Sequence, residues 1–91
     1  MDLVQYRGAY RFADRAALDK ALSAALQHNT EWLSRFSPFG SSVRVDLDLP
    51  ARSDQRRAAA SVLQTLAYLA VEGIVVARHK DLAVDVFVCG E

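Results

Sequence analysis

The chain has 91 residues, of which 52% are hydrophobic, and its 11 basic and 11 acidic side chains leave no formal net charge. This length suits one domain, residues 1–91. A neutral chain lacks the basic surface that nonspecific nucleic-acid binding and polybasic membrane attachment require. We therefore expect neither a nucleic acid nor a membrane as a partner.

The cysteine content and the first residues bear on the cellular compartment. Cys89 is the single cysteine, which excludes an internal disulfide, whereas small secreted domains often depend on disulfides. The first twelve residues, MDLVQYRGAYRF, contain no apolar run of signal-peptide length. We expect a cytoplasmic protein. The excess of Arg over Lys among many Ala residues is typical of a bacterial genome rich in G and C.

The N-terminal part predicts a strand followed by a helix. Residues 3–12 alternate between two faces, and period two with aromatic residues on one face indicates a half-buried strand. The apolar face of this strand holds Val4, Tyr6, Gly8, Tyr10 and Phe12. Residues 14–27 are rich in Ala and repeat Leu at helical spacing, and Asp14 suits the N-cap of a helix.

The segment TEWLSRFSPFGSS, residues 30–42, is open to two interpretations. Apolar residues spaced three or four apart allow the preceding helix to continue. The sequence HNT is unfavourable inside a helix, however, and SPFGSS supplies Pro and Gly for a hairpin connection of about five or six residues. We favour a strand over residues 30–37 and then the hairpin. Trp32 and Phe36 then belong to the core, and Phe39 is exposed in the turn.

Two further elements follow in the middle of the chain. Residues 43–49, VRVDLDL, alternate between apolar and charged side chains and predict a half-buried strand. After Pro50 a long helix is predicted, with Ser53 as its N-cap and Gly73 as the residue after its C-cap.

The C-terminal segment predicts a closing hairpin. Strand 74–78 turns at about Lys80 and Asp81 into strand 82–88. On the last strand, alternation places Leu82, Val84, Val86 and Val88 on one face and Ala83, Asp85, Phe87 and Cys89 on the other.

This order of elements predicts an α+β fold. We expect a ferredoxin-like βαββαβ sandwich with an additional C-terminal strand and with both helices on one face of the sheet. In that topology the first and third strands are antiparallel neighbours, so Arg7 and Arg11 would lie near Asp46 and Asp48. Opposite charges on adjacent strands stabilise a sheet by about 0.2–1 kcal/mol per pair.

The residue types that usually act in catalysis or metal binding do not cluster in this sequence. His28 and His79 are far apart and have no metal-ligand spacing with Cys, Asp or Glu. Cys89 lacks a neighbouring base, so we interpret it as a small strand residue. We expect no metal, no cofactor and no catalytic residue. The aromatic motif of RNA-recognition modules has no counterpart either.

A cluster of Arg52, Arg56 and Arg57 surrounds the start of the second helix. Free N–H groups at a helix N-terminus can hold an anion such as phosphate or a carboxylate. The alternative, which we favour, is a solvated first turn whose arginines face nearby Asp residues. No Gly-rich loop precedes the helix, so a phosphate-cradling motif is missing.

Exposed apolar residues point to self-association. The strands of the closing hairpin are apolar on both faces, so Ile74, Val76 and Phe87 are candidates for an exposed interface, and Phe39 is a further candidate. An apolar edge strand is also a template for pairing with another chain. We expect a non-enzymatic interaction or regulatory module that forms a homodimer and binds a protein partner or a small ligand. The alternative is a small enzyme with a pocket lined by Tyr6, Tyr10, Trp32 and an Arg.

Overall fold

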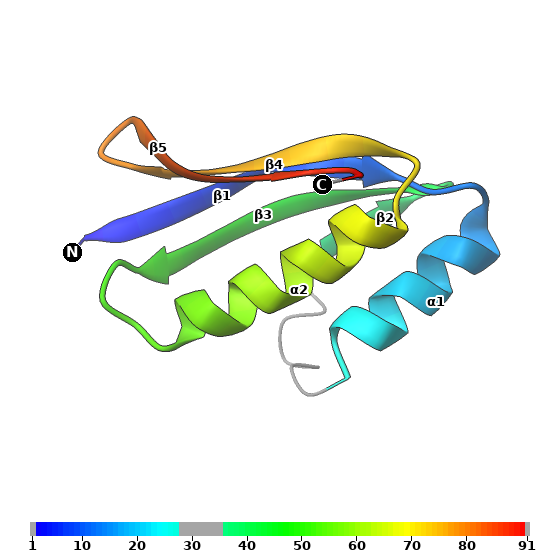
Figure 1. The fold of residues 1–91 in the computed structure, drawn as a ribbon, viewed down its shortest axis with the longest axis horizontal. Coiled ribbons are helices and arrows are strands. Elements are labelled where there is room, and N and C mark those ends of the chain that lie inside the picture. The colour runs from blue at the N-terminus through cyan, green and yellow to red at the C-terminus, as the bar shows by residue number, and fades with distance from the viewer. Residues whose placement is uncertain (1, 28–35, 91) are drawn as a thin grey trace.

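The computed structural model describes residues 2–27 and 36–90, which form one antiparallel sheet and two helices (Figure 1). The elements are β1 (Leu3–Arg11), α1 (Arg15–Ala25), β2 (Phe36–Phe39), β3 (Ser42–Pro50), α2 (Gln55–Leu69), β4 (Glu72–His79) and β5 (Leu82–Val88). The strand order is β2-β3-β1-β4-β5. Both helices cover the same face of the sheet, and we call the opposite face the open face. The predicted α+β class is confirmed.

The alternation of β1 sets the two faces of the sheet at its centre. Val4, Tyr6 and Tyr10 are buried toward the helices, whereas Gln5 and Arg7 are exposed. β1 pairs with β3 on one side and β4 on the other, so its alternation extends across the sheet through the register. A strand with one apolar and one polar face is stable only with one face covered, which is the role of the helices.

The first helix begins where the sequence predicts. The Asp14 carboxylate accepts a hydrogen bond from the Ala17 backbone N–H at 2.7 Å, as an N-cap side chain does. The hydroxyl of Ser53 accepts from the Gln55 N–H at 3.0 Å, but Asp54 occupies the N-cap position of α2.

The predicted end of α2 is wrong. The helix ends at Leu69, and Gly73 lies inside β4 and does not cap the helix. Gly73 has φ 133°, and a Cβ atom at this position would collide with the Ala9 carbonyl oxygen of β1. Glycine is therefore required here because β1 and β4 approach each other closely.

The hairpin predicted around residues 36–42 is present and is tighter than expected. β2 begins at the buried Phe36, opposite Val45 of β3. Pro38 pairs with Val43 and Phe39 pairs with Ser42, which leaves only residues 40–41 for the turn. Phe39 therefore belongs to a strand and not to the turn. Pro38 is tolerated because β2 is an edge strand. Trp32 and the strand predicted before residue 36 lie outside the described residues.

The closing hairpin turns at the predicted residues. Lys80 and Asp81 have φ 53° and 66°, and two consecutive positive φ values fit the twist of a two-residue hairpin turn. A bulge interrupts the pairing between Ala77 and Arg78, and Leu82 lies opposite His79. Because the bulge shifts the alternation, Leu82 does not share a face with Val86, contrary to the sequence prediction.

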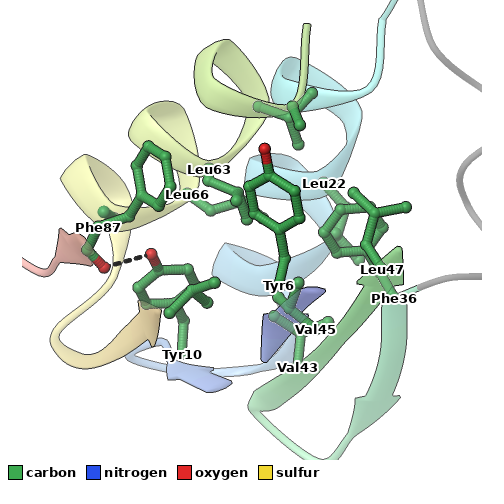
Figure 2. Packing of buried hydrophobic residues seen from close by; sticks show 14 of the residues in the cluster. Tyr6, Tyr10, Leu22, Phe36, Val43, Val45, Leu47, Leu63, Leu66 and Phe87 are labelled. Atoms are coloured by element: carbon green, nitrogen blue, oxygen red, sulfur yellow. Dashed lines mark hydrogen bonds between the residues drawn. The ribbon is translucent and has the colours of Figure 1, made fainter. Parts of the chain in front are cut away.

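The core fills the space between the sheet and the helices (Figure 2). Its large side chains come from both layers, with Tyr6 and Tyr10 on β1 facing Leu63 and Leu66 of α2. Phe36 is buried in the same core, as the sequence predicts. Neither helix among the described residues is long and apolar enough to cross a membrane.

Candidate interaction surface

The β1–β3 side of the open face is charged. The Arg7 guanidinium lies 3.0 Å from a carboxylate oxygen of Asp46 and 2.8 Å from one of Asp48, and both acids are on β3. This pairing is the one predicted for neighbouring first and third strands. All three side chains are partly exposed, so solvent weakens each ion pair.

Arg11 does not join these acids, contrary to the sequence prediction. Its register partner on β3 is Ser42, and its Nε atom donates to Glu72 of β4 at 2.9 Å. The hydrogen bond and then the charge of Arg11 lower the pKa of the Glu72 carboxyl below its usual value. The prediction failed because β4 begins at Glu72, before the predicted strand 74–78, and the register places Glu72 opposite Arg11.

The β4–β5 side of the open face is apolar. Ile74 lies opposite Val88 and Val76 lies opposite Val86, so two cross-strand aliphatic pairs adjoin one another. We call these four residues the open-face patch. Ile74 is 45% exposed and Val86 is 49% exposed, and the other two are partly exposed. The sequence-predicted candidates Ile74 and Val76 therefore lie together on this surface.

Phe87, the third residue predicted for this surface, does not belong to it. It is only 5% exposed and lies opposite the buried Val75, on the face that the helices cover. Its ring centroid is 6.5 Å from that of Tyr6, and its carbonyl oxygen accepts a hydrogen bond from the Tyr10 hydroxyl (Figure 2). The prediction that Phe87 is exposed is wrong, because alternation alone does not tell which face of an apolar strand is covered.

The outer edge of β5 carries a feature that the sequence analysis missed. The Cys89 N–H donates to the Gly73 carbonyl of β4, so the backbone N–H groups of odd-numbered residues near this end face β4. The N–H of Val86 therefore faces the free edge of the sheet. There it donates a hydrogen bond to the Oδ1 atom of its neighbour Asp85, with a nitrogen–oxygen distance of 3.0 Å. A charged side chain on an edge strand hinders pairing with a further strand.

A shallow hollow lies at the centre of the open face. It has a volume of about 530 Å³ and lies over Gly8, Ala9, Gly73 and Ile74, with Arg7 and Arg44 at its rim. Gly8 and Gly73 contribute backbone atoms to its lining, because by register both belong to the face that the helices cover, and Ala9 contributes a methyl group. A Cβ atom at Gly8 would collide with the Ile74 carbonyl oxygen, so backbone packing requires this glycine. We call this feature the central hollow.

Phe39 protrudes beside the central hollow. Its side chain is 87% exposed, and it borders a second hollow of about 440 Å³ that shares Ala9 and Arg44 with the first. Phe39 pairs with Ser42, which pairs with Arg11, and this register places the ring on the open face. The exposure predicted for Phe39 is confirmed.

A groove also runs along the edge of β5. It has a volume of about 330 Å³ and lies between α2 and the last strand. Its lining residues are Gln64, Ala67, Tyr68, Val86, Phe87 and Val88. Tyr68 is 77% exposed and belongs to the helix layer, away from the open face.

The three arginines of the candidate anion site are arranged unequally. Arg52 and Arg57 are exposed, whereas Arg56 is partly buried. The Nε atom of Arg56 donates to the Tyr6 hydroxyl at 3.3 Å, and a terminal nitrogen of Arg56 donates to the Ala51 carbonyl at 3.3 Å. These bonds hold Arg56 against the core. Anion binding at these arginines stays a prediction.

The titratable residues named in the sequence analysis do not converge. The His79 Nε2 atom is 3.9 Å from an Asp2 carboxylate oxygen, and the Cys89 thiol donates to the Ala70 carbonyl at 3.0 Å. His28 lies outside the described residues. Among residues 2–27 and 36–90, no group of three or more His, Cys, Asp or Glu side chains could hold a metal ion.

The alternative prediction was an enzyme pocket lined in part by Tyr6 and Tyr10. Both of these side chains belong to the hydrophobic core. Tyr6 and Tyr10 are almost completely buried, and both hydroxyls take part in hydrogen bonds with protein atoms. Trp32 lies outside the described residues. The two tyrosines therefore cannot face a substrate without a rearrangement of the core.

Comparison with protein-family models, curated proteins and solved structures gave no match to this chain. The molecule is a small α+β domain whose five-stranded antiparallel sheet is covered by helices on one face and carries an apolar patch and a hollow on the other.

Proposed function

We propose that this chain is a non-enzymatic interaction or regulatory module that associates with a second copy of itself through the open face and binds a protein partner or a small ligand there. The observation that carries the proposal is the open-face patch. Two adjoining aliphatic pairs on one exposed sheet surface favour burial against another apolar surface.

Association through the face is favoured over association through the β5 edge. An edge-to-edge dimer would need the Val86 N–H to bond to a partner strand, and the Asp85 carboxylate already accepts from this group. Two copies of Asp85 would also approach each other across such an edge. Like charges that face each other across paired strands destabilise a sheet.

The proposal also covers the fold family and the cellular compartment of the protein. We assign the topology to the ferredoxin-like βαββαβ sandwich with one added C-terminal strand. The order β2-β3-β1-β4 and the antiparallel pairing of β1 with both neighbours support this assignment. The free thiol of Cys89 suits the reducing cytoplasm.

The test is a measurement of molecular mass against protein concentration by analytical ultracentrifugation. We expect a monomer–dimer equilibrium in the wild-type chain. Val86→Asp places a charge in the open-face patch and raises the dimer dissociation constant by about tenfold or more. Ser23→Asp places the same charge on the exposed surface of α1 and leaves the constant unchanged.

Circular dichroism spectra of both variants check that the fold is kept, as the exposure of Val86 and Ser23 leads us to expect. A wild-type chain that remains monomeric at high micromolar concentration contradicts the proposal. Equal weakening by the two substitutions also contradicts it, because only one of them lies on the open face.

A further inference from the structure

We infer that the two copies in this dimer are related by a two-fold axis that lies between their open faces, runs at right angles to the strands and crosses β4 at Val75. The inference rests on the proposed function and names the contacts that a second copy of this chain makes. Arg44 of each copy then faces Asp46 of the other, and Arg78 of each copy faces Glu72 of the other.

Two arginines of the open face have no acidic partner in their own chain. Arg44 on β3 and Arg78 on β4 are exposed, and neither forms an ion pair with any residue that the structure describes. Arg7 and Arg11 lie on the same face and are paired with acids of their own chain. Arg44 and Arg78 are therefore free to pair with the acids of another molecule.

The pairing of the strands arranges the open-face residues in rows that run across the sheet. Two rows, which we call the inner rows, lie on either side of the level of Val75. From β3 to β5, one inner row consists of Asp46, Arg7, Val76 and Val86. The other consists of Arg44, Ala9, Ile74 and Val88. The proposed axis lies midway between them, so each inner row of one copy lies over the other inner row of the second copy.

This exchange of the inner rows brings opposite charges together and apolar side chains together. Arg44 lies over Asp46 of the second copy. On β4 and β5 the two halves of the open-face patch change places, so the patch packs against its own copy and leaves water. On β1 the long side chain of Arg7 lies over Ala9 in the central hollow, so a large side chain meets a small one.

The next open-face rows, which we call the outer rows, continue the pattern. From β3 to β4, one outer row consists of Asp48, Gln5 and Arg78, and the other consists of Ser42, Arg11 and Glu72. The same axis places Arg78 over Glu72 of the second copy. It also places the remaining charged side chains of the outer rows over neutral ones, Asp48 over Ser42 and Arg11 over Gln5. In the inner and outer rows, no two like charges face each other.

Other positions of the axis bring like charges together. An axis moved by one residue toward Asp46 places Asp46 over Asp46 and Arg7 over Arg7, and one moved the other way places Arg44 over Arg44. An axis that runs along β1, parallel to the strands, again places Arg7 over Arg7. Like charges across an interface disfavour association. The charge pattern therefore selects the axis at Val75, and every contact occurs twice in the closed dimer.

The geometry of packed sheets accommodates these contacts. The strands of two packed sheets cross at about 30°. A rotation of this size displaces Arg44 and Arg78 by roughly 3–6 Å relative to the facing strand, which their long side chains can span. The strands β3, β1, β4 and β5 each lie over their own copies and cover roughly 500 Å² in plan. Side-chain relief raises this area toward the ~800 Å² per partner of a standard interface.

A charge swap between Glu72 and Arg78 tests the axis. Glu72→Arg and Arg78→Glu each place like charges opposite each other in both copies of this contact. We expect each single variant to raise the dimer dissociation constant by about tenfold or more in analytical ultracentrifugation. The double variant Glu72→Arg/Arg78→Glu restores opposite charges across the dimer, and we expect its constant to return close to the wild-type value.

Recovery in the double variant cannot arise within one chain. Glu72 and Arg78 are six positions apart on β4, so their backbones are separated by roughly 20 Å. The double variant also keeps the net charge of the wild type, so a change in overall charge cannot explain the recovery. Lys20→Glu is the control for the single variants, because it reverses one charge on the exposed surface of α1 and leaves the constant unchanged. Circular dichroism checks that Glu72→Arg, which loses its ion pair with Arg11, keeps the fold.

The outcomes separate this inference from the proposed function. A wild-type dimer that Val86→Asp dissociates, but whose charge-swapped double variant stays as weak as the single variants, overturns the axis and keeps the function. Single variants that dimerise like the wild type overturn the axis as well. A monomeric wild-type chain overturns both.

Discussion

The Tyr10 hydroxyl donates a hydrogen bond to the backbone carbonyl oxygen of Phe87 at 2.6 Å (Figure 2). These residues belong to β1 and β5, which are separated by β4 in the sheet. Tyr10 lies opposite Gly73 of β4, so its ring crosses a position that has no side chain. The hydrogen bond therefore connects the edge strand β5 to the central strand β1, across Gly73 of β4.

Removal of this bond should lower stability by a modest amount. We expect Tyr10→Phe to reduce the free energy of unfolding by about 1 kcal/mol, because the ring stays and one buried hydrogen bond is lost. Urea denaturation measures the change. Tyr68→Phe is the control, because Tyr68 is 77% exposed, and it should leave the free energy within about 0.5 kcal/mol of wild type. Equal effects of both substitutions would contradict the role of the bond.

The same phenol should make stability depend on alkaline pH. Burial, and then the nearby Cys89, raise the pKa of Tyr10 far above its ordinary value. The folded state therefore holds this proton more tightly than the unfolded state. The contribution is fully present below about pH 10, the ordinary phenol pKa, and is lost as the pH rises from there through the raised folded-state pKa.

Urea denaturation between about pH 8 and 11 tests this dependence. We expect the free energy of unfolding of wild type to fall more steeply above about pH 10 than that of Tyr10→Phe. Parallel curves for the two proteins would show that Tyr10 does not titrate differently in the folded and unfolded states.

Gly73 should tolerate substitution less well than another glycine with positive φ. Alanine at Gly73, with φ 133°, must adopt a strained backbone and also collides with the Ala9 carbonyl oxygen. Gly40, with φ 63°, has open space around its position, so alanine there meets strain alone. We expect Gly40→Ala to cost about 1–2 kcal/mol and Gly73→Ala to cost clearly more. Thermal denaturation of both variants measures the difference, and similar losses would rule out the collision.

Much of the fold could be predicted from local patterns in the sequence. The alternation of residues 3–12 and 43–49 identified β1 and β3, and Asp14 identified the start of α1. The turn at Lys80 and Asp81 followed from the spacing of the apolar residues around it, although neither residue is the Gly or Asn usual in such turns. These features depend on residues that are close together in the chain, so the sequence alone is enough to predict them.

Features that depend on long-range pairing were harder to predict. The partner of Arg11 depends on the register of β1 with β4, and no local signal revealed that β4 begins at Glu72. The central hollow is lined in part by the backbone of two glycines, Gly8 and Gly73, that are 65 positions apart in the sequence. A glycine inside a strand indicates a bulge or a close backbone approach, but it does not identify the strand that approaches.

The assignment of Phe87 and Val86 to opposite faces can be tested by a matched pair of substitutions. Phe87 is buried beside Tyr6, whereas its neighbour Val86 is half exposed on the open face. We expect Phe87→Ala to reduce the free energy of unfolding by about 3–5 kcal/mol, because it leaves a cavity in the core. Val86→Ala should cost less than about 1 kcal/mol in the monomer.

Urea denaturation at low micromolar concentration, where a weak dimer dissociates, separates this effect from association. The order of the two effects should be reversed for dimerisation, where Val86→Ala is the more damaging substitution. Val86→Ala weakens the dimer while the domain stays stable, whereas Phe87→Ala loses stability first. A stable Phe87→Ala chain with impaired dimerisation would place Phe87 at the interface after all, and the face assignment of β5 would then be wrong.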